Sequence, residues 1–178
     1  MKPTLILLLL SISASLVAQT PEGLWKEDSP NGALTAATRR IPDKKYIWRG
    51  DLDGFRLVVF PLKPGSDKNT GAPYFSRDFP ERVPARVQWS PDSRYLVLTT
   101  TSSGGHSPWH YTTYVLSVPQ RRVLSPDDRI GPIVSPEFSF KSADTVVLEV
   151  GPRSAEGIDF EHPKKIDVDL ARLFSAAK

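Results

Sequence analysis

Residues 89–98 read WSPDSRYLVL and residues 114–118 read YVLSV, and these two stretches decide the fold class. In the first, proline sets φ for the second position of a turn, and the flanking serine and aspartate can bond to the local backbone. Tyr95 to Leu98 then form an apolar strand suited to burial on both faces. In the second stretch apolar residues alternate, as in a strand with one buried face. The pattern predicts strands joined by a tight turn and a longer loop.

The flanking sequence extends this β pattern in both directions. Val87 and Trp89 share one face of a strand that precedes the turn, and a further Ser-Pro-Asp turn stands at Ser125 to Asp127. A weaker copy follows, in which Phe138 and Phe140 alternate before a turn and an apolar strand. The 11 glycines and 17 prolines are spread throughout, which disfavours long helices. The chain is therefore predicted to be all-β.

Strands are predicted at 55–60, 95–101, 111–118, 145–150 and 166–170. The secondary structure of residues 172–178 is left open. Residues 63–84 are predicted to form a long loop with room for one edge strand. Trp89 and Phe140 are separated by slightly more than the ~40–45 residues of a common four-stranded propeller blade. Blade-like units are expected near 86–128 and 133–174, with a partial unit at 44–62.

At these residues the sequence resembles the TolB-type, WD40-like propeller repeat. In that family an aromatic residue precedes a Ser-Pro-Asp-Gly turn, an apolar strand, a loop and a Tyr-x-Leu-x-Val strand. Ser93 stands where the family has glycine. The resemblance implies four-stranded antiparallel blades and a role in binding proteins or peptides, and some relatives are the non-catalytic propellers of peptidases.

A closed propeller needs ~4–8 blades of four strands. At the observed spacing, residues 19–178 hold about three. One copy of the chain should therefore form an incomplete propeller of stacked four-stranded sheets as a single domain. A second copy could complete it, so a homo-oligomer is one expectation. Use of the same repeat motif in a different β fold is the other.

A second resemblance, to the lipocalins, rests on Gly23-Leu24-Trp25 and on Thr112-Thr113-Tyr114. In that family the first motif opens an eight-stranded barrel around a small apolar ligand. Thr113 stands where the family has aspartate, and the Ser-Pro-Asp turns have no counterpart there. The lipocalin-like barrel is therefore the alternative fold, with ligand transport as the function it implies.

The N-terminus predicts export. Lys2 precedes the apolar run Leu5 to Leu10, and cleavage after Ala18 would remove residues 1–18 as a signal peptide. The apolar stretch is shorter than the ~20 residues that cross a bilayer, so no membrane association is expected after cleavage. The chain has no cysteine, hence no lipid-anchoring cysteine and no disulfide, which fits a bacterial periplasmic or secreted protein.

The formal net charge of +3 comes from scattered basic pairs rather than a basic groove, so no nucleic-acid partner is predicted. No Gly-x-Ser-x-Gly motif and no metal-ligand spacing occurs, so no catalytic residue, metal or cofactor is assigned.

The candidate binding surface is the loop from Thr99 to Tyr111, which combines Gly104 and Gly105 with four ring-bearing side chains. These predicted binding residues are His106, Trp109, His110 and Tyr111.

Three functions follow in order of preference. The first is an exported, non-catalytic module that binds a protein or peptide partner through this loop. The second is a lipocalin-like carrier of a small apolar ligand. The third is a metal-dependent or serine hydrolase, whose catalytic groups would meet only in the folded chain.

Overall fold

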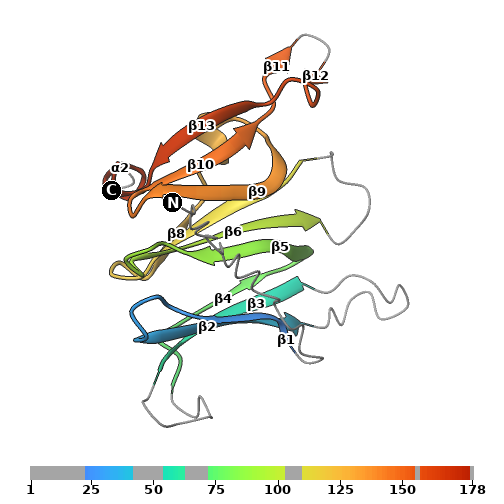
Figure 1. Ribbon diagram of the computed structural model, residues 1–178. Helices are drawn as coiled ribbons and strands as arrows, with labels where there is room; N and C mark the ends of the chain where they lie inside the picture. The colour runs from blue at the N-terminus through green and yellow to red at the C-terminus, as the bar shows by residue number, and fades with distance from the viewer. Residues whose placement is uncertain (1–22, 42–53, 63–71, 103–109, 155–156, 177–178) are drawn as a thin grey trace, which may run out of the picture.

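The computed structural model describes residues 23–41, 54–62, 72–102, 110–154 and 157–176, and most of this part of the chain is β-strand. Three antiparallel sheets are stacked one above another, as Figure 1 shows. We call them blade 1, blade 2 and blade 3. Their strands are β1 (Gly23–Asp28), β2 (Leu34–Ile41), β3 (Gly54–Pro61) and β4 (Phe75–Phe79) in blade 1; β5 (Arg82–Trp89), β6 (Tyr95–Ser102), β7 (Thr112–Ser117) and β8 (Arg122–Leu124) in blade 2; and β9 (Ile133–Ser142), β10 (Thr145–Val150) and β13 (Lys164–Asp169) in blade 3.

Within each blade the strands are hydrogen-bonded in chain order, so that blades 1 and 2 are simple four-stranded meanders. Blade 3 has three strands, and between β10 and β13 the chain forms a small hairpin of β11 (Arg153–Ser154) and β12 (Gly157–Ile158). Two short helices complete the described elements: α1 (Asp127–Ile130) between blades 2 and 3, and α2 (Leu170–Ser175) after β13. The fold is all-β and of the incomplete propeller type.

The lipocalin-like alternative is wrong, because the described strands are divided among separate sheets instead of closing one barrel. Trp25 lies in β1 and packs, half-buried, against the core between blades 1 and 2. Thr112 to Tyr114 begin β7, in the middle of a blade. The aromatic residues Trp89 and Phe140 fall on β5 and β9, which are the first strands of two different sheets, as the repeat interpretation requires.

The core consists of two apolar layers, one on each face of blade 2. Strand β6 supplies both, since Leu96 and Leu98 point into the layer against blade 1, whereas Tyr95 and Val97 point into the layer against blade 3. All four side chains are buried. The prediction that this strand is buried on both faces is therefore confirmed.

The turn between β5 and β6 is held by its own polar side chains. The Ser90 hydroxyl donates to Asp92 Oδ1 (2.8 Å) and accepts the Tyr95 backbone N–H (2.9 Å). Asp92 Oδ1 also accepts the Arg94 backbone N–H at 3.1 Å. Ser93 follows with φ of 64°, a left-handed conformation that L-residues adopt only at a cost.

The turn between β1 and β2 repeats this arrangement. The Ser29 hydroxyl donates to Asn31 Oδ1 (2.8 Å) and accepts the Leu34 backbone N–H (3.0 Å). Asn31 Oδ1 accepts the Ala33 backbone N–H at 3.0 Å, and Gly32 adopts φ of 66°. Ser-Pro-Asn-Gly at 29–32 is thus the first copy of the turn. The prediction placed a partial unit at 44–62, from which the structure describes only β3, the third strand of a blade that begins with β1.

The predicted strands at 55–60, 95–101, 111–118 and 145–150 correspond to β3, β6, β7 and β10. Within 63–84, β4 is the edge strand of blade 1, and β5 already begins at Arg82. The last predicted strand, 166–170, corresponds to β13 but starts two residues too late and ends one residue too late. Asp169 accepts the Arg172 backbone N–H at 2.9 Å, and this cap starts α2 at Leu170.

The outer faces of blades 1 and 3 carry ion pairs, and on blade 1 they lie beside the buried side chains of Val58 and Phe60. On blade 1, Arg56 and Asp78 form an exposed ion pair (2.5 Å) and the Arg39 guanidinium lies over the Phe60 ring. On blade 3, Lys141 pairs with Asp167 at 2.5 Å. Within the described residues Phe160 is the only large hydrophobic side chain that is exposed, and it lies on neither face, in the segment between β12 and β13.

Candidate functional site

A pocket opens between blades 2 and 3, at the end of β7 opposite to the Ser90 turn. Its cavity volume is about 530 Å³. It is lined by His110, residues 127–132, residues 150–153 and Ile158. Three connections therefore meet here: the segment entering β7, the segment joining β8 to β9, and the segment leaving β10. We call this the inter-blade pocket.

Asp127 is the most perturbed ionisable group of this pocket. Its side chain is largely buried, and this desolvation raises the pKa of the carboxyl to about 6. The Thr113 backbone N–H donates to both carboxylate oxygens, at 3.3 and 3.1 Å, and this bond lowers the pKa in part. The charge of Asp128 raises the pKa, and the charge of Arg82 lowers it. The carboxyl thus fixes the start of β7 and remains titratable near neutral pH.

His110 presents an unused polar atom. Its Nδ1 is buried and has no hydrogen-bond partner among the described residues. Thr113, fully buried beside Asp127, likewise has an Oγ1 without such a partner. Buried polar atoms cost stability unless they are paired, so a ligand or water that supplied a hydrogen bond would be bound favourably here.

The remaining predicted binding residues have different positions. Tyr111 donates its backbone N–H to the Ile133 carbonyl (2.8 Å), and its half-buried ring packs against the core between blades 2 and 3. This contact gives Tyr111 a structural role beside the pocket. His106 and Trp109 lie outside the described residues. The assignment of all four to binding stays a prediction.

The opposite wall of the pocket depends on a glycine. A Cβ at Gly151 would lie 2.6 Å from side-chain carbons of both Ile158 and Val134, so only glycine lets the hairpin pack this closely. Arg153 and Ile158 of the hairpin line the pocket. Close backbone packing therefore defines this wall. The side chain of Arg153, by contrast, is exposed.

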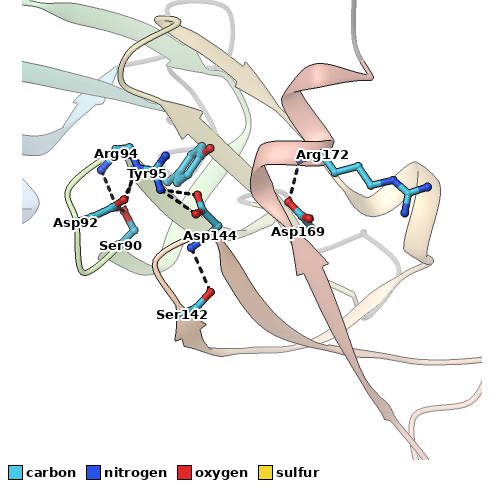
Figure 2. Close-up of polar contacts among 8 residues, drawn as sticks. All are labelled: Ser90, Asp92, Arg94, Tyr95, Ser142, Asp144, Asp169 and Arg172. Carbon is cyan, nitrogen blue, oxygen red and sulfur yellow. Dashed lines mark hydrogen bonds and ion pairs between the residues drawn. The ribbon is translucent and has the colours of Figure 1, made fainter.

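The other end of the interface between blades 2 and 3 carries a charge network (Figure 2). Arg94 donates to both carboxylate oxygens of Asp144, each at 2.8 Å, and also pairs with Asp92. Burial acts to raise the pKa of Asp92, but hydrogen bonds from Arg94 and Ser90, together with the Arg94 charge, outweigh it and lower the pKa. All three side chains belong to blade turns, so the network joins the turn between β5 and β6 to the turn between β9 and β10.

No family model and no curated protein sequence matches the chain. Among solved structures, it is similar to a protein described as a conserved lipoprotein from Clostridium novyi, with a TM-score of 0.44 and 10% identity over 84% of this chain and 88% of that one. It is also similar to a protein described as a dipeptidyl aminopeptidase IV from Bacteroides ovatus (TM-score 0.46, 10% identity, 84% of this chain). A mutant puromycin hydrolase gives a TM-score of 0.34 at 11% identity over 83% of this chain.

The chain spans 23% and 27% of the lengths of the two enzymes. Similarities at this level carry no argument about activity. Within the described ranges, no group of three or more His, Cys, Asp or Glu side chains is arranged to hold a metal ion. Neither described helix is long and apolar enough to cross a membrane.

Proposed function

We propose that the protein is an exported, non-catalytic binding module that receives part of a protein or peptide partner in the inter-blade pocket. The observation that carries this proposal is the meeting of three connections around one cavity, where His110 Nδ1 is buried without a partner among the described residues. Segments that rigid strands position in this way commonly carry recognition. The resemblance of 89–98 and 114–118 to TolB-type repeats supports a protein or peptide partner, and the apolar run after Lys2 supports export to the periplasm or the exterior.

The chemistry of the pocket suits a segment with both polar and apolar groups. Ile158 and Val150 supply apolar wall, Asp127 accepts hydrogen bonds or pairs with a cation, and Arg153 can bind a carboxylate or carbonyl. Such a mixture is typical of sites that recognise peptide backbone together with one or two side chains. His106 and Trp109 precede His110 in the chain, and we include them in the proposed binding segment.

A displayed random-peptide library provides the test. Peptides selected on the whole protein are measured by fluorescence anisotropy against the wild type, His110→Ala and His162→Ala. His162 is the matched control, because it is an exposed histidine that does not line the pocket. Binding should weaken at least about tenfold in His110→Ala, as expected for a lost buried hydrogen bond and its packing, and should be unchanged in His162→Ala.

Two results would contradict the proposal. Equal affinity of the selected peptides for wild type and His110→Ala would remove the pocket from recognition. Cleavage of the bound peptides, followed by mass spectrometry, would show that the protein is an enzyme. Thermal unfolding of each variant distinguishes a binding defect from a folding defect.

A further inference from the structure

The carboxyl of Asp127 has no charged partner within the described residues. Its oxygens accept the Thr113 backbone N–H at 3.3 and 3.1 Å, and the Ser125 hydroxyl also stabilises its charge. None of the ion pairs in the described part of the chain includes it. An ionised carboxylate offers about four lone-pair sites, so acceptor capacity remains unused. The inter-blade pocket therefore contains a largely buried acceptor that the fold itself does not saturate.

A second acceptor lies in the same pocket. His110 Nδ1 is buried without a partner in the described ranges, and it accepts a hydrogen bond when the ring carries its proton on Nε2. Both groups lie at the start of β7, because His110 precedes this strand closely and Asp127 bonds to the amide of Thr113. Two acceptors in one cavity suit a ligand group that carries several donors. Alkylammonium and guanidinium groups carry several N–H donors and no acceptor.

The charged groups around Asp127 do not compensate for its burial. The charge of Arg82 lowers its pKa and that of Asp128 raises it, yet desolvation is the largest effect and the pKa stays at about 6. Arg129 and Arg153 also line the pocket, but both are exposed, as is Asp128, so water and salt screen their charges. The lining as a whole is balanced in charge. A bound cation would therefore gain its free energy from short contacts with the buried carboxylate, not from long-range attraction.

We propose that the inter-blade pocket receives a basic side chain, lysine or arginine, of the partner segment, whose charged end binds the Asp127 carboxylate and the His110 ring. This inference rests on the proposed function and names the side chain that the pocket selects. A desolvated carboxylate without a counter-charge is unfavourable, and a cation that pairs with it removes that penalty. Val150 and Ile158 of the lining would contact the apolar stem of such a side chain. The cavity of about 530 Å³ also has room for the flanking peptide backbone.

The test uses short capped peptides of glycine and alanine whose central residue is lysine, arginine, norleucine or glutamate. Binding to the whole protein is followed by NMR through the amide resonances of Thr113, which donates to Asp127, and of Gly131, which lines the pocket. The lysine or the arginine peptide should shift both resonances saturably. The norleucine peptide keeps the apolar stem without the charge and should bind at least about tenfold more weakly, and the glutamate peptide more weakly still.

Two substitutions on α1 identify the carboxylate that binds the cation. Asp127→Asn should weaken the basic peptide at least about tenfold at neutral pH, because the buried negative charge is lost while an oxygen that can accept the Thr113 N–H remains. Asp128→Asn is the matched control, since it removes an exposed carboxylate from the lining of the same pocket, and it should change the affinity less than about threefold. Thermal unfolding of both variants verifies that they are folded.

The pH dependence of binding provides an independent measurement. A lysine or arginine side chain keeps its charge between about pH 5 and pH 7, whereas Asp127, with its pKa of about 6, changes from mostly protonated to mostly ionised. The affinity of the basic peptide should therefore rise about tenfold over this range. The rise should persist, from a lower starting affinity, in His110→Ala.

The proposal is overturned if the norleucine peptide binds as tightly as the basic peptides, if Asp127→Asn and Asp128→Asn bind alike, or if the affinity does not rise with pH. These failures differ from failure of the proposed function. Library peptides that require His110 but contain no basic residue would retain the pocket as a peptide site and refute the selection of a cation. Library peptides that bind His110→Ala as tightly as the wild type would contradict both.

Discussion

Blade 2 packs against both of its neighbours through mixed aliphatic and aromatic layers, but within the described residues ion pairs between blades occur only at the interface with blade 3. In the first interface Phe55 stacks on Phe79 with ring centroids 4.8 Å apart, and Phe79 meets Tyr114 edge-on at the same distance. In the second, Arg86 lies over the Phe138 ring (5.2 Å) and pairs with Glu137. Both interfaces thus combine apolar packing with polar contacts, and the second also contains ion pairs, whose strength depends on pH and salt.

The turns at the ends of the blades show the same difference. Blades 1 and 2 are joined there by a neutral hydrogen bond, from the Asn31 backbone N–H to Ser93 Oγ at 3.0 Å. Blades 2 and 3 are joined by the two charged bonds between Arg94 and Asp144. The inter-blade pocket lies in the second interface, with Asp127 in its wall. We infer that the interface with blade 1 provides stability, whereas the interface with blade 3 responds to pH and salt.

Truncation of β6 compares the two interfaces directly and has the largest expected effect. Leu98→Ala removes a fully buried side chain from the layer against blade 1 and should lower the free energy of unfolding by about 3–5 kcal/mol. Val97→Ala removes two methyl groups from the layer against blade 3 and should cost about 2 kcal/mol. Urea denaturation measures both. Because Leu98→Ala removes three carbon atoms and Val97→Ala two, only a difference well beyond about 1 kcal/mol would show that the two layers are packed differently.

The pH dependence of Asp127 tests the response of the second interface. Since burial raises the folded-state pKa to about 6, the folded protein holds this proton more tightly than the unfolded chain, whose carboxyl titrates near ~3.9. Stability should therefore fall as pH rises from about 4 to 6, by about 1–3 kcal/mol in this group's contribution. Asp127→Asn should lack this contribution. Parallel stability profiles for the two proteins between pH 4 and pH 7 would refute the assignment.

Gly32 tests whether the first turn truly matches the second. Its φ of 66° is close to the 64° of Ser93, and a Cβ there would meet no atom within 4 Å. Gly32→Ala should therefore destabilise the protein by about 1 kcal/mol through backbone strain alone. Thermal unfolding gives the value, and an unchanged midpoint would show that the turn relaxes to another conformation.

The smallest expected effect is that of salt on Arg94. The guanidinium and the Asp144 carboxylate are 47% and 40% exposed, so their pairing should contribute less than about 1 kcal/mol. Arg94→Met should reduce the salt dependence of stability between low and high ionic strength, while the ion pairs Arg56–Asp78, Arg86–Glu137 and Lys141–Asp167 retain their own. Ser93→Ala removes the neutral hydrogen bond between blades 1 and 2. It should lower stability by a similar amount, and this loss should be the same at every salt concentration. The pair interpretation fails if both variants respond to salt alike.

The repeat could be predicted from residues 89–98 because each feature of that stretch is local. The turn is made by Ser90 and Asp92 bonding to neighbouring backbone groups, and the strand that follows has no polar residue to interrupt it. The first turn, at 29–32, was missed because its flanks differ. Asp28 stands in place of the aromatic residue, and β2 is built from small residues and threonine, which give a weak strand signal.

The candidate site was only partly accessible to sequence reasoning. His110 could be selected because a loop with Gly104, Gly105 and aromatic residues precedes a strand, and the structure places it in the wall of the inter-blade pocket. Asp127 gave no functional signal, since Ser125 to Asp127 has the composition of an ordinary turn. Its perturbed pKa arises from burial between two blades. This burial depends on residues that are far apart in the sequence, so a local sequence pattern cannot predict it.

The polar outer face of blade 3 disfavours growth of the stack at that end. Arrays of repeated units lengthen when a terminal unit offers the same sticky surface that its interior neighbours bury. Here the ion pair Lys141–Asp167 occupies that terminal surface, so a further blade would have to remove water from these charges in order to add on. Face-to-face contact between two copies through blade 3 is therefore disfavoured.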